Sequence, residues 1–318
     1  MSKDKTVLIT GIAGFIGSNL ADRLVREGYR VIGIDNLSAG ILEQVPKEVE
    51  FHKLDIRSKE IFPIIKKADV VFHLAAKNCV SECQKSPYET ADINIMGTVN
   101  VFEACREARV DRVLYAESSA IYEGTKILPT PETDFTPQTI YAVSKAANHL
   151  FAKAYGLGFD MKMVGFRYLN VYGPRQDYRR AIPPVMSRFI IKLLMNEKPP
   201  VYGDGSERRD YIHIDDVNNF HLICIESDDV IGKVFNLGTG KNYSVLEILN
   251  MMQKILGTNI DPEFVPPLIV GATPANLADI TAARSVGWDP QIQLEKGLGG
   301  MIEYIKEEIA KGNITHSL

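Results

Sequence analysis

The sequence lacks long apolar runs, an excess of positive charge and a dense set of cysteines. No apolar stretch in its 318 residues is long enough to cross a bilayer, and Met1–Lys5 has no apolar core of a secretory signal. The net charge of -4 does not favour a nucleic-acid-binding surface. We therefore expect a cytoplasmic protein that acts on neither membranes nor nucleic acids.

Only four cysteines are present, and they give no complete metal-binding pattern. Cys79 and Cys83 have the spacing of half a metal site, but no second Cys or His pair stands at a matching distance. We predict that no metal is bound and that the thiols stay reduced. The length exceeds what one core usually supports, so one large domain or two closely joined domains are expected.

The first half of the chain alternates between short apolar strands and amphipathic helices. Phe15 to Arg26 has helical periodicity, between strands expected at Lys5–Thr10 and Arg30–Ile34. This alternation predicts an α/β fold with a doubly wound parallel sheet, the Rossmann arrangement. Further strands are expected at 49–54, 69–74, 112–116 and 161–166, and helices at 58–67, 90–108 and 139–155.

A glycine-rich turn joins the first strand to the first helix. Gly11 would permit the tight turn, Gly14 would let the backbone approach a pyrophosphate, and Gly17 would allow close packing of helix on strand. The first helical residues, Phe15 and Ile16, would present N–H groups to the phosphates. The spacing of three and three differs from the commonest fingerprint, and a glycine turn without a ligand is the alternative.

Polar residues follow the second and third strands. Asp35 stands where a carboxylate bonds the ribose hydroxyls of a dinucleotide, and it would repel a 2′-phosphate, which favours NAD over NADP. Asp35, Asn36 and Ser38 are equally good turn residues. In Asp55-Ile56, the carboxylate could reach the adenine edge or could cap a helix.

Two further strand ends face the expected ligand crevice. Leu74, Ala75 and Ala76 would let the backbone lie against the cofactor. After the fifth strand, Ser119 could hydrogen-bond a reacting carbonyl, or it could only cap a turn.

Tyr141 and Lys145 stand four residues apart and therefore share one face of a helix. A free phenol has a pKa of about 10, and a neighbouring cation lowers it. The pair could transfer a proton, although a Tyr and a Lys on an exposed helix by chance is the alternative.

The alternation weakens after Asn170, where prolines become frequent. We expect a dinucleotide-binding domain over 1–173, with 212–240 threading back into it. Residues 174–211 and 241–318 would form a smaller, mixed α/β C-terminal lobe for the substrate. After Asn170, helices are expected at 184–196, 215–226, 244–255 and 294–310, and a strand at 233–237.

Together these motifs resemble the extended short-chain dehydrogenase/reductase family, in its NAD-dependent sugar-nucleotide epimerase/dehydratase branch. The resemblance rests on segments that span nearly the whole chain, at 10–17, 35–38, 73–76, 94–98, 118–120, 141–145, 167–175 and 203–211. It implies a homodimer that holds NAD and a UDP-sugar. A dimer face could include Ala146, Ala147, Leu150 and Phe151, or these residues could belong to the core.

The resemblance also implies roles for single residues. Tyr141 would act as the base on the sugar 4-hydroxyl, Lys145 would bond the nicotinamide ribose, and Ser119 would polarise the same oxygen. Asn94 would contact the cofactor. Asn170 and Arg209 would hold the diphosphate, for which the planar fork of arginine is suited, unless Arg209 lies in a solvated basic loop.

The family's reactions differ in net chemistry, and 4-epimerisation through a transient 4-keto sugar fits this chain best. Dehydratases carry an Asp-Glu pair after the serine, where this chain has Ala120 and Ile121. The substrates expected are UDP-glucose and UDP-galactose, or their N-acetylated forms. A dehydratase, another 4-keto-forming oxidoreductase such as a UDP-glucuronate epimerase, and a non-catalytic NAD-binding sensor are the alternatives.

Three positions depart from the family pattern or bear on the substrate. The family has a diphosphate-binding Arg before Ala278, where residues 266–271 include no basic side chain. Glu123 replaces a usual glycine. Asn276 is smaller than the Tyr of strict hexose epimerases, which leaves room for an N-acetyl group.

Overall fold

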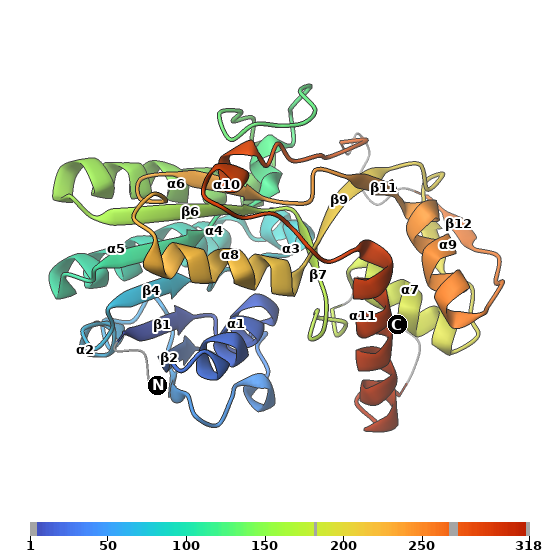
Figure 1. The fold of residues 1–318 in the computed structure, drawn as a ribbon, viewed down its shortest axis with the longest axis horizontal. Helices are drawn as coiled ribbons and strands as arrows, with labels where there is room; N and C mark the ends of the chain where they lie inside the picture. The colour runs from blue at the N-terminus through green and yellow to red at the C-terminus, as the bar shows by residue number, and fades with distance from the viewer. Residues whose placement is uncertain (1–4, 181–182, 267–272, 316–318) are drawn as a thin grey trace.

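A seven-stranded parallel sheet forms the centre of the computed structural model, which describes residues 5–180, 183–266 and 273–315 (Figure 1). The strand order β10-β6-β5-β4-β1-β2-β3 confirms the predicted doubly wound α/β fold. Because the order reverses between β1 and β4, a crevice opens at the carboxyl ends of these two strands. The strands are β1 (Thr6–Thr10), β2 (Arg30–Asp35), β3 (Glu50–Lys53), β4 (Val70–His73), β5 (Arg112–Ala116), β6 (Lys162–Tyr168) and β10 (Val234–Leu237).

Helices cover both faces of this sheet, so its strands are apolar on both sides. In β1, Val7 and Ile9 face one core and Leu8 faces the other, as the two-residue repeat of a strand requires. The first core is closed by α1 (Phe15–Arg26) and α8 (Ile214–Glu226), and the second by α2 (Ile61–Ile65), α5 (Gly97–Ala108) and α6 (Ile140–Phe159).

The helix expected over 90–108 is interrupted. It consists of α4 (Pro87–Ala91), a π-helical turn at Asp92–Met96, and α5, with α3 (Val80–Lys85) before it. Such π turns often occur at functional sites. Of the described helices, none has the length and apolar character needed to cross a membrane.

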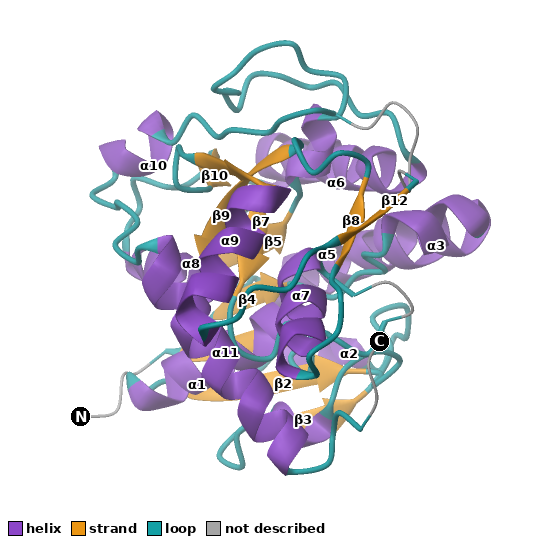
Figure 2. Cartoon of the chain, turned by 90° about the vertical axis from the view of Figure 1, so that its right-hand side faces the viewer, coloured by secondary structure: helices purple, strands orange, loops and turns teal. Residues whose placement is uncertain are grey.

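The second lobe has its own apolar core, at the right of Figure 1 and toward the viewer in Figure 2. Its helices are α7 (Val185–Leu194), α9 (Val245–Leu256) and α11 (Leu294–Ala310). Its strands are short and were not expected from the sequence: β7 (Asn170–Tyr172), β9 (Arg208–His213) and β11 (Asn242–Ser244) form one sheet, and β8 (Pro200–Tyr202) and β12 (Glu263–Val265) form another.

The chain returns twice from the second lobe to the first. The first return places α8 over the large sheet and pairs β10 with β6. The second, α10 (Thr281–Ser285) and the residues after it, was expected to belong wholly to the second lobe. Instead Trp288 packs on Phe220 of α8, with ring centroids 5.4 Å apart, and its indole N–H donates to the Asp216 carbonyl at 3.0 Å.

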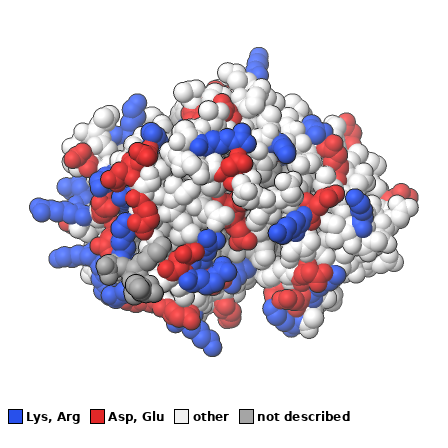
Figure 3. Space-filling view, in the orientation of Figure 1, with Lys and Arg blue, Asp and Glu red and all other residues white. Residues whose placement is uncertain are grey.

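Acidic and basic side chains are intermingled over much of the face drawn in Figure 3, in keeping with the small net charge.

Candidate active site

The turn after β1 has contacts that only glycine permits. Gly11 has φ of +73°, and a Cβ on it would lie 2.8 Å from the backbone nitrogen of Ala75. A Cβ on Gly17 would lie 2.2 Å from the Gly11 carbonyl oxygen. Gly14 is the N-cap of α1 and brings no side chain to the first helical turn. The turn therefore offers the close backbone approach that a dinucleotide phosphate requires, and the phosphate contacts of Gly14, Phe15 and Ile16 stay predictions.

Asp35 organises the loop beside this turn. Its two carboxylate oxygens accept backbone N–H groups of Ala13 at 3.0 Å and Leu37 at 2.8 Å. Burial of the side chain raises the pKa of Asp35. In the next turn, the Asn36 side chain accepts from the Ser38 N–H at 3.0 Å. The turn chemistry is thus present, and the ribose contacts of these three residues stay predictions.

Asp55 is held by an arginine at the end of β3. Arg57 donates to its carboxylate from Nε at 2.8 Å and from Nη2 at 2.8 Å, which lowers the pKa of Asp55 well below its usual range. The Asn36 amide also donates to it, at 2.9 Å. Asp55 does not cap a helix, because α2 begins only after its N-cap residue Glu60, so that alternative was wrong. Ile56 is buried beside Gly97.

The loop after β4, which contains Leu74, Ala75 and Ala76, is fixed from behind. Asn94 is fully buried; its side chain accepts from the Lys77 N–H at 2.8 Å and donates to the Lys77 carbonyl at 2.9 Å. It also donates to the Ser144 hydroxyl at 3.0 Å. Asn94 therefore ties this loop to α6, and a direct contact with a cofactor remains a prediction.

Tyr141 and Lys145 lie on the buried face of α6, which begins at its N-cap residue Thr139. The Tyr141 side chain lines a cavity of about 600 Å³ together with Ser118 and Ser119. The ammonium of Lys145 donates to the Ala116 carbonyl at 3.0 Å. The helix thus places both side chains at the carboxyl end of β5.

Burial dominates the electrostatics of this pair. It raises the pKa of Tyr141 to about 12, although the hydrogen bond from Ser118 and the charge of Arg180 act in the opposite direction. Burial likewise lowers the pKa of Lys145 to about 8, against the effect of Glu117. The expectation that a neighbouring cation lowers the pKa of the phenol was wrong for the protein without cofactor. The desolvation of the phenolate raises this pKa by more than the nearby positive charge lowers it.

The serine whose side chain acts to lower the pKa of Tyr141 is Ser118, one residue before the predicted Ser119. The Ser118 oxygen accepts the Ala120 N–H at 3.2 Å, which leaves its hydroxyl proton free to point at the phenol oxygen. Both serines line the cavity. We therefore move the catalytic assignment from Ser119 to Ser118 as a proposal.

The cavity is bounded by both lobes. Among its lining residues, Asn170 donates to the Asp210 carbonyl at 2.8 Å, and Arg209 is paired with Glu207 at 2.9 Å. Asn276 accepts from the Asp210 N–H at 2.8 Å, so its side chain is engaged with β9. The sequence interpretation missed three other lining residues, Arg180, Arg188 and Tyr202.

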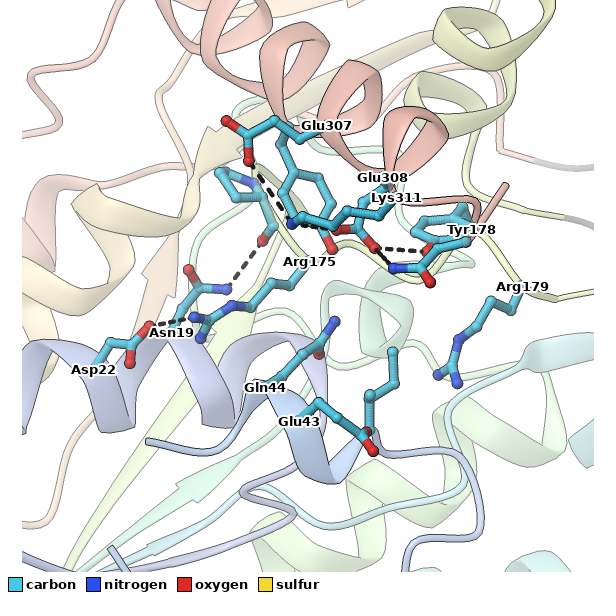
Figure 4. Close-up of a pocket in the computed structure, with 14 residues that line it drawn as sticks. Asn19, Asp22, Glu43, Gln44, Arg175, Tyr178, Arg179, Glu307, Glu308 and Lys311 are labelled. Carbon is cyan, nitrogen blue, oxygen red and sulfur yellow. Dashed lines mark hydrogen bonds and ion pairs between the residues drawn. The ribbon is translucent and has the colours of Figure 1, made fainter. Parts of the chain in front are cut away.

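A second cavity, of about 730 Å³, lies between α1, residues 41–44 and α11 (Figure 4). Its lining includes neither Tyr141 nor Lys145 and mixes both charges. Across it, Arg175 pairs with Asp22 at 2.5 Å and the Asn19 amide donates to the Pro174 carbonyl at 3.0 Å. These contacts join α1 of the first lobe to the segment that follows β7.

The described residues include no group of three His, Cys, Asp or Glu side chains that could hold a metal. Cys79, Cys83, Cys105 and Cys224 are all free thiols.

A glycine turn at the switch point, a buried Tyr–Lys pair and a cavity shared by two lobes define a dinucleotide-dependent enzyme of the short-chain dehydrogenase type. Residues 7–238 match the NAD dependent epimerase/dehydratase family, and the chain belongs to that family. Its cofactor is NAD, and Gly11, Gly14 and Gly17 fit that group.

Three similar proteins illustrate the family. A UDP-glucose 4-epimerase of Mycolicibacterium smegmatis is 34% identical over 310 residues, which cover 95% of this chain and 98% of the relative. The UDP-glucose 4-epimerase of Thermotoga maritima, solved with UDP-glucose, has a TM-score of 0.91 and 33% identity, with 96% and 99% of the two chains covered. The UDP-N-acetylglucosamine 4-epimerase of Methanobrevibacter ruminantium, solved with UDP-N-acetylmuramic acid, has a TM-score of 0.92 and 30% identity, with the same coverage.

Proposed function

We propose that this protein is an NAD-dependent UDP-sugar 4-epimerase. The observation that carries the proposal is the buried Tyr141 side chain, which lines with Ser118 a cavity bounded by both lobes, with Lys145 one helical turn away. The three relatives described above, which match this chain over nearly their whole length, are UDP-sugar 4-epimerases.

Tyr141 takes and returns the proton of the sugar 4-hydroxyl. Ser118 donates a hydrogen bond where the negative charge develops, and Lys145 favours the phenolate. Bound NAD would supply a reversible hydride acceptor for sugar C4, and its positive charge would favour the phenolate further. A phenol with a pKa of about 12 in the protein alone becomes a usable base when positive charge is added beside it.

The second lobe holds the diphosphate. Asn170 and Arg209 line the same cavity as Tyr141, and a guanidinium fork matches two phosphate oxygens at once. In this geometry the sugar lies toward Tyr141 and the nucleotide toward β8 and β9.

Net elimination is disfavoured by the residues beside the catalytic serine. With Ser118 in that role, the next two residues are Ser119 and Ala120, and neither side chain is a carboxylic acid. A non-catalytic NAD sensor is disfavoured because such a protein has no use for a buried, desolvated Lys145 beside a cavity tyrosine.

Product analysis tests the proposal. We expect purified protein to interconvert UDP-glucose and UDP-galactose, or their N-acetylated forms, without consuming added NAD, while UDP-glucuronate is the comparison substrate. Tyr141→Phe should keep NAD bound and lose at least about 10³-fold in kcat. Tyr155→Phe is the matched control, because Tyr155 lies on the same helix and bonds Glu103 away from the cavity. Full turnover by Tyr141→Phe would refute the mechanism.

We also propose that the enzyme is a homodimer that works in a reducing compartment such as the cytoplasm. Val143, Leu150 and Phe151 are exposed apolar residues on α6, 47%, 58% and 39% exposed, whereas Ala146 packs into the core with Ile121. The free thiols fit a reducing compartment.

Light scattering should give twice the mass of the chain for the parent protein. Leu150→Glu should give one chain's mass, whereas Ile255→Glu, at an exposed position on α9, should not. A monomeric parent protein would refute the dimer.

A further inference from the structure

Arg188 is a buried cation on the wall of the substrate cavity. It lies on α7 between Met186 and Ile190, and only 7% of the residue is exposed. Its guanidinium carbon is 4.7 Å from the centre of the Tyr202 ring. Its Nε atom is buried and has no hydrogen-bond partner among the described residues. A buried cationic side chain that lines a cavity and whose polar groups the protein leaves partly unsatisfied is a candidate to bind an incoming ligand.

Arg188 differs in its charge balance from the other two arginines of the cavity. Arg209 is paired with Glu207, and Arg180 with Asp177. Within the described ranges, no carboxylate lies at ion-pair distance from Arg188. Burial of this charge is unfavourable and lowers the pKa of Arg188. The position is therefore suited to an anionic group that arrives with the substrate.

We propose that Arg188 binds the diphosphate of the nucleotide sugar together with Arg209. This inference rests on the proposed function and adds a specificity residue to it. The family resemblance predicts a diphosphate-binding arginine before Ala278, and Arg188 would take over that role. In this chain residues 266–271 contain no basic side chain, and 267–272 lie outside the described residues. The uncharged nucleobase of a nucleotide sugar would not balance the buried charge of Arg188, whereas its diphosphate would.

Binding measurements with two probes test this assignment. Titration calorimetry on the NAD-loaded protein should show that Arg188→Gln weakens the binding of UDP about 10- to 100-fold. Binding of uridine, which has no phosphate, should change less than about threefold. Arg188→Lys, which keeps the charge but loses the planar fork, should lie between. Lys192→Gln is the matched control, because Lys192 lies one turn further on α7 and is paired with Glu197.

Kinetics and thermal unfolding separate a binding role from a structural one. Because the diphosphate is held equally before and during reaction, Arg188→Gln should raise KM more than it lowers kcat. Without nucleotide, Arg188→Gln should raise the Tm, because an unpaired buried charge is removed. It should also make the increase in Tm on UDP binding smaller. A structural arginine stacked on Tyr202 would instead give a lower Tm on substitution.

Two results would overturn the inference: unchanged UDP affinity in Arg188→Gln, or an equal loss for UDP and uridine, which would place Arg188 at the base. A parent protein that binds UDP but epimerises no UDP-sugar would defeat the proposed function and leave the Arg188 assignment standing. A parent protein that binds no UDP would defeat both.

Discussion

The carboxylate of Glu123 binds Thr139 twice, through the backbone N–H at 2.8 Å and through the hydroxyl at 2.9 Å. It also accepts the Gln138 N–H at 3.2 Å. Thr139 is the N-cap of α6, two residues before Tyr141. A negative charge at this end of the helix is favourable because the first N–H groups are unpaired and carry positive potential. Glu123, which departs from the family pattern, therefore fixes the helix end that positions Tyr141.

Glu123→Ala should lower both stability and turnover. We expect a loss of about 1–2 kcal/mol in the free energy of unfolding, since a charged cap and its hydrogen bonds are removed. A looser Tyr141 should reduce kcat up to about tenfold with bound NAD unchanged. Denaturant unfolding and steady-state kinetics measure the two effects.

Glu295→Ala is the control for this prediction, because Glu295 stands in the first turn of α11 and is exposed. It should change stability by less than about 1 kcal/mol and leave kcat unchanged. If Glu123→Ala kept full activity, Glu123 would stabilise the helix without positioning Tyr141.

The two adjacent serines should differ strongly in their effect on catalysis. Ser118→Ala removes the hydroxyl that acts to lower the pKa of Tyr141 and should lower kcat by about 10- to 100-fold. Ser119→Ala should change kcat less than about threefold. Steady-state kinetics on both variants, with NAD content as the check on folding, measure the difference. The reverse order of effects would restore the assignment made from the sequence.

Much of this fold could be predicted from the sequence, because long periodic segments carry a strong signal. The helix at Phe15–Arg26 was predicted to the residue, and the strand at Arg112–Ala116 likewise. Gly11 could be recognised because its φ of +73° and its closeness to Ala75 admit no side chain. By contrast, β7 and β11 are three residues long, which is too short for a periodic pattern.

The parts of the site that could not be predicted depend on three-dimensional packing. Whether Ser118 or Ser119 reaches Tyr141 depends on where β5 ends and on the direction of the turn that follows it. Arg188 lies in a mostly apolar helix, so its charge gives no functional signal in the sequence. Its lack of a carboxylate partner becomes visible only in the assembled structure. The raised pKa of Tyr141 follows from burial of its side chain. Burial cannot be predicted from the four-residue spacing of Tyr141 and Lys145.

Glu117 should set the alkaline limit of activity. Lys145 has a pKa lowered by burial to about 8, so its charge, and the phenolate it favours, are lost as pH rises through that value. The negative charge of Glu117 holds that pKa up. In Glu117→Gln the pKa of Lys145 should fall further, and the decline of kcat/KM should begin at a lower pH. A pH–rate profile of both proteins measures the shift.

Glu117→Gln should also destabilise the fold, because Glu117 is paired with buried Arg167 at 2.8 Å. Loss of one partner of a buried pair costs about 3–5 kcal/mol. Glu103→Gln is the control, because it also removes a carboxylate that is hydrogen-bonded to α6: Glu103 accepts from Tyr155, away from the cavity. This variant should leave the pH profile unchanged. An alkaline limb that did not move in Glu117→Gln would show that Glu117 acts on stability alone.

Two glycine-to-alanine changes should have opposite effects. In Gly17→Ala the new methyl group would lie 2.2 Å from the Gly11 carbonyl oxygen, so α1 must shift away from the turn. We expect a loss of about 1–3 kcal/mol in the free energy of unfolding and weaker retention of NAD.

In Gly158→Ala, at the exposed end of α6, nothing lies within 4 Å of the new atom. That change should stabilise the protein by about 0.4–1 kcal/mol, because it restricts the unfolded chain, and should leave bound NAD unchanged. Thermal unfolding and the absorbance of NAD released on denaturation measure both. If Gly17→Ala retained NAD as well as Gly158→Ala does, the close packing of α1 on the β1 turn would not be what holds the cofactor.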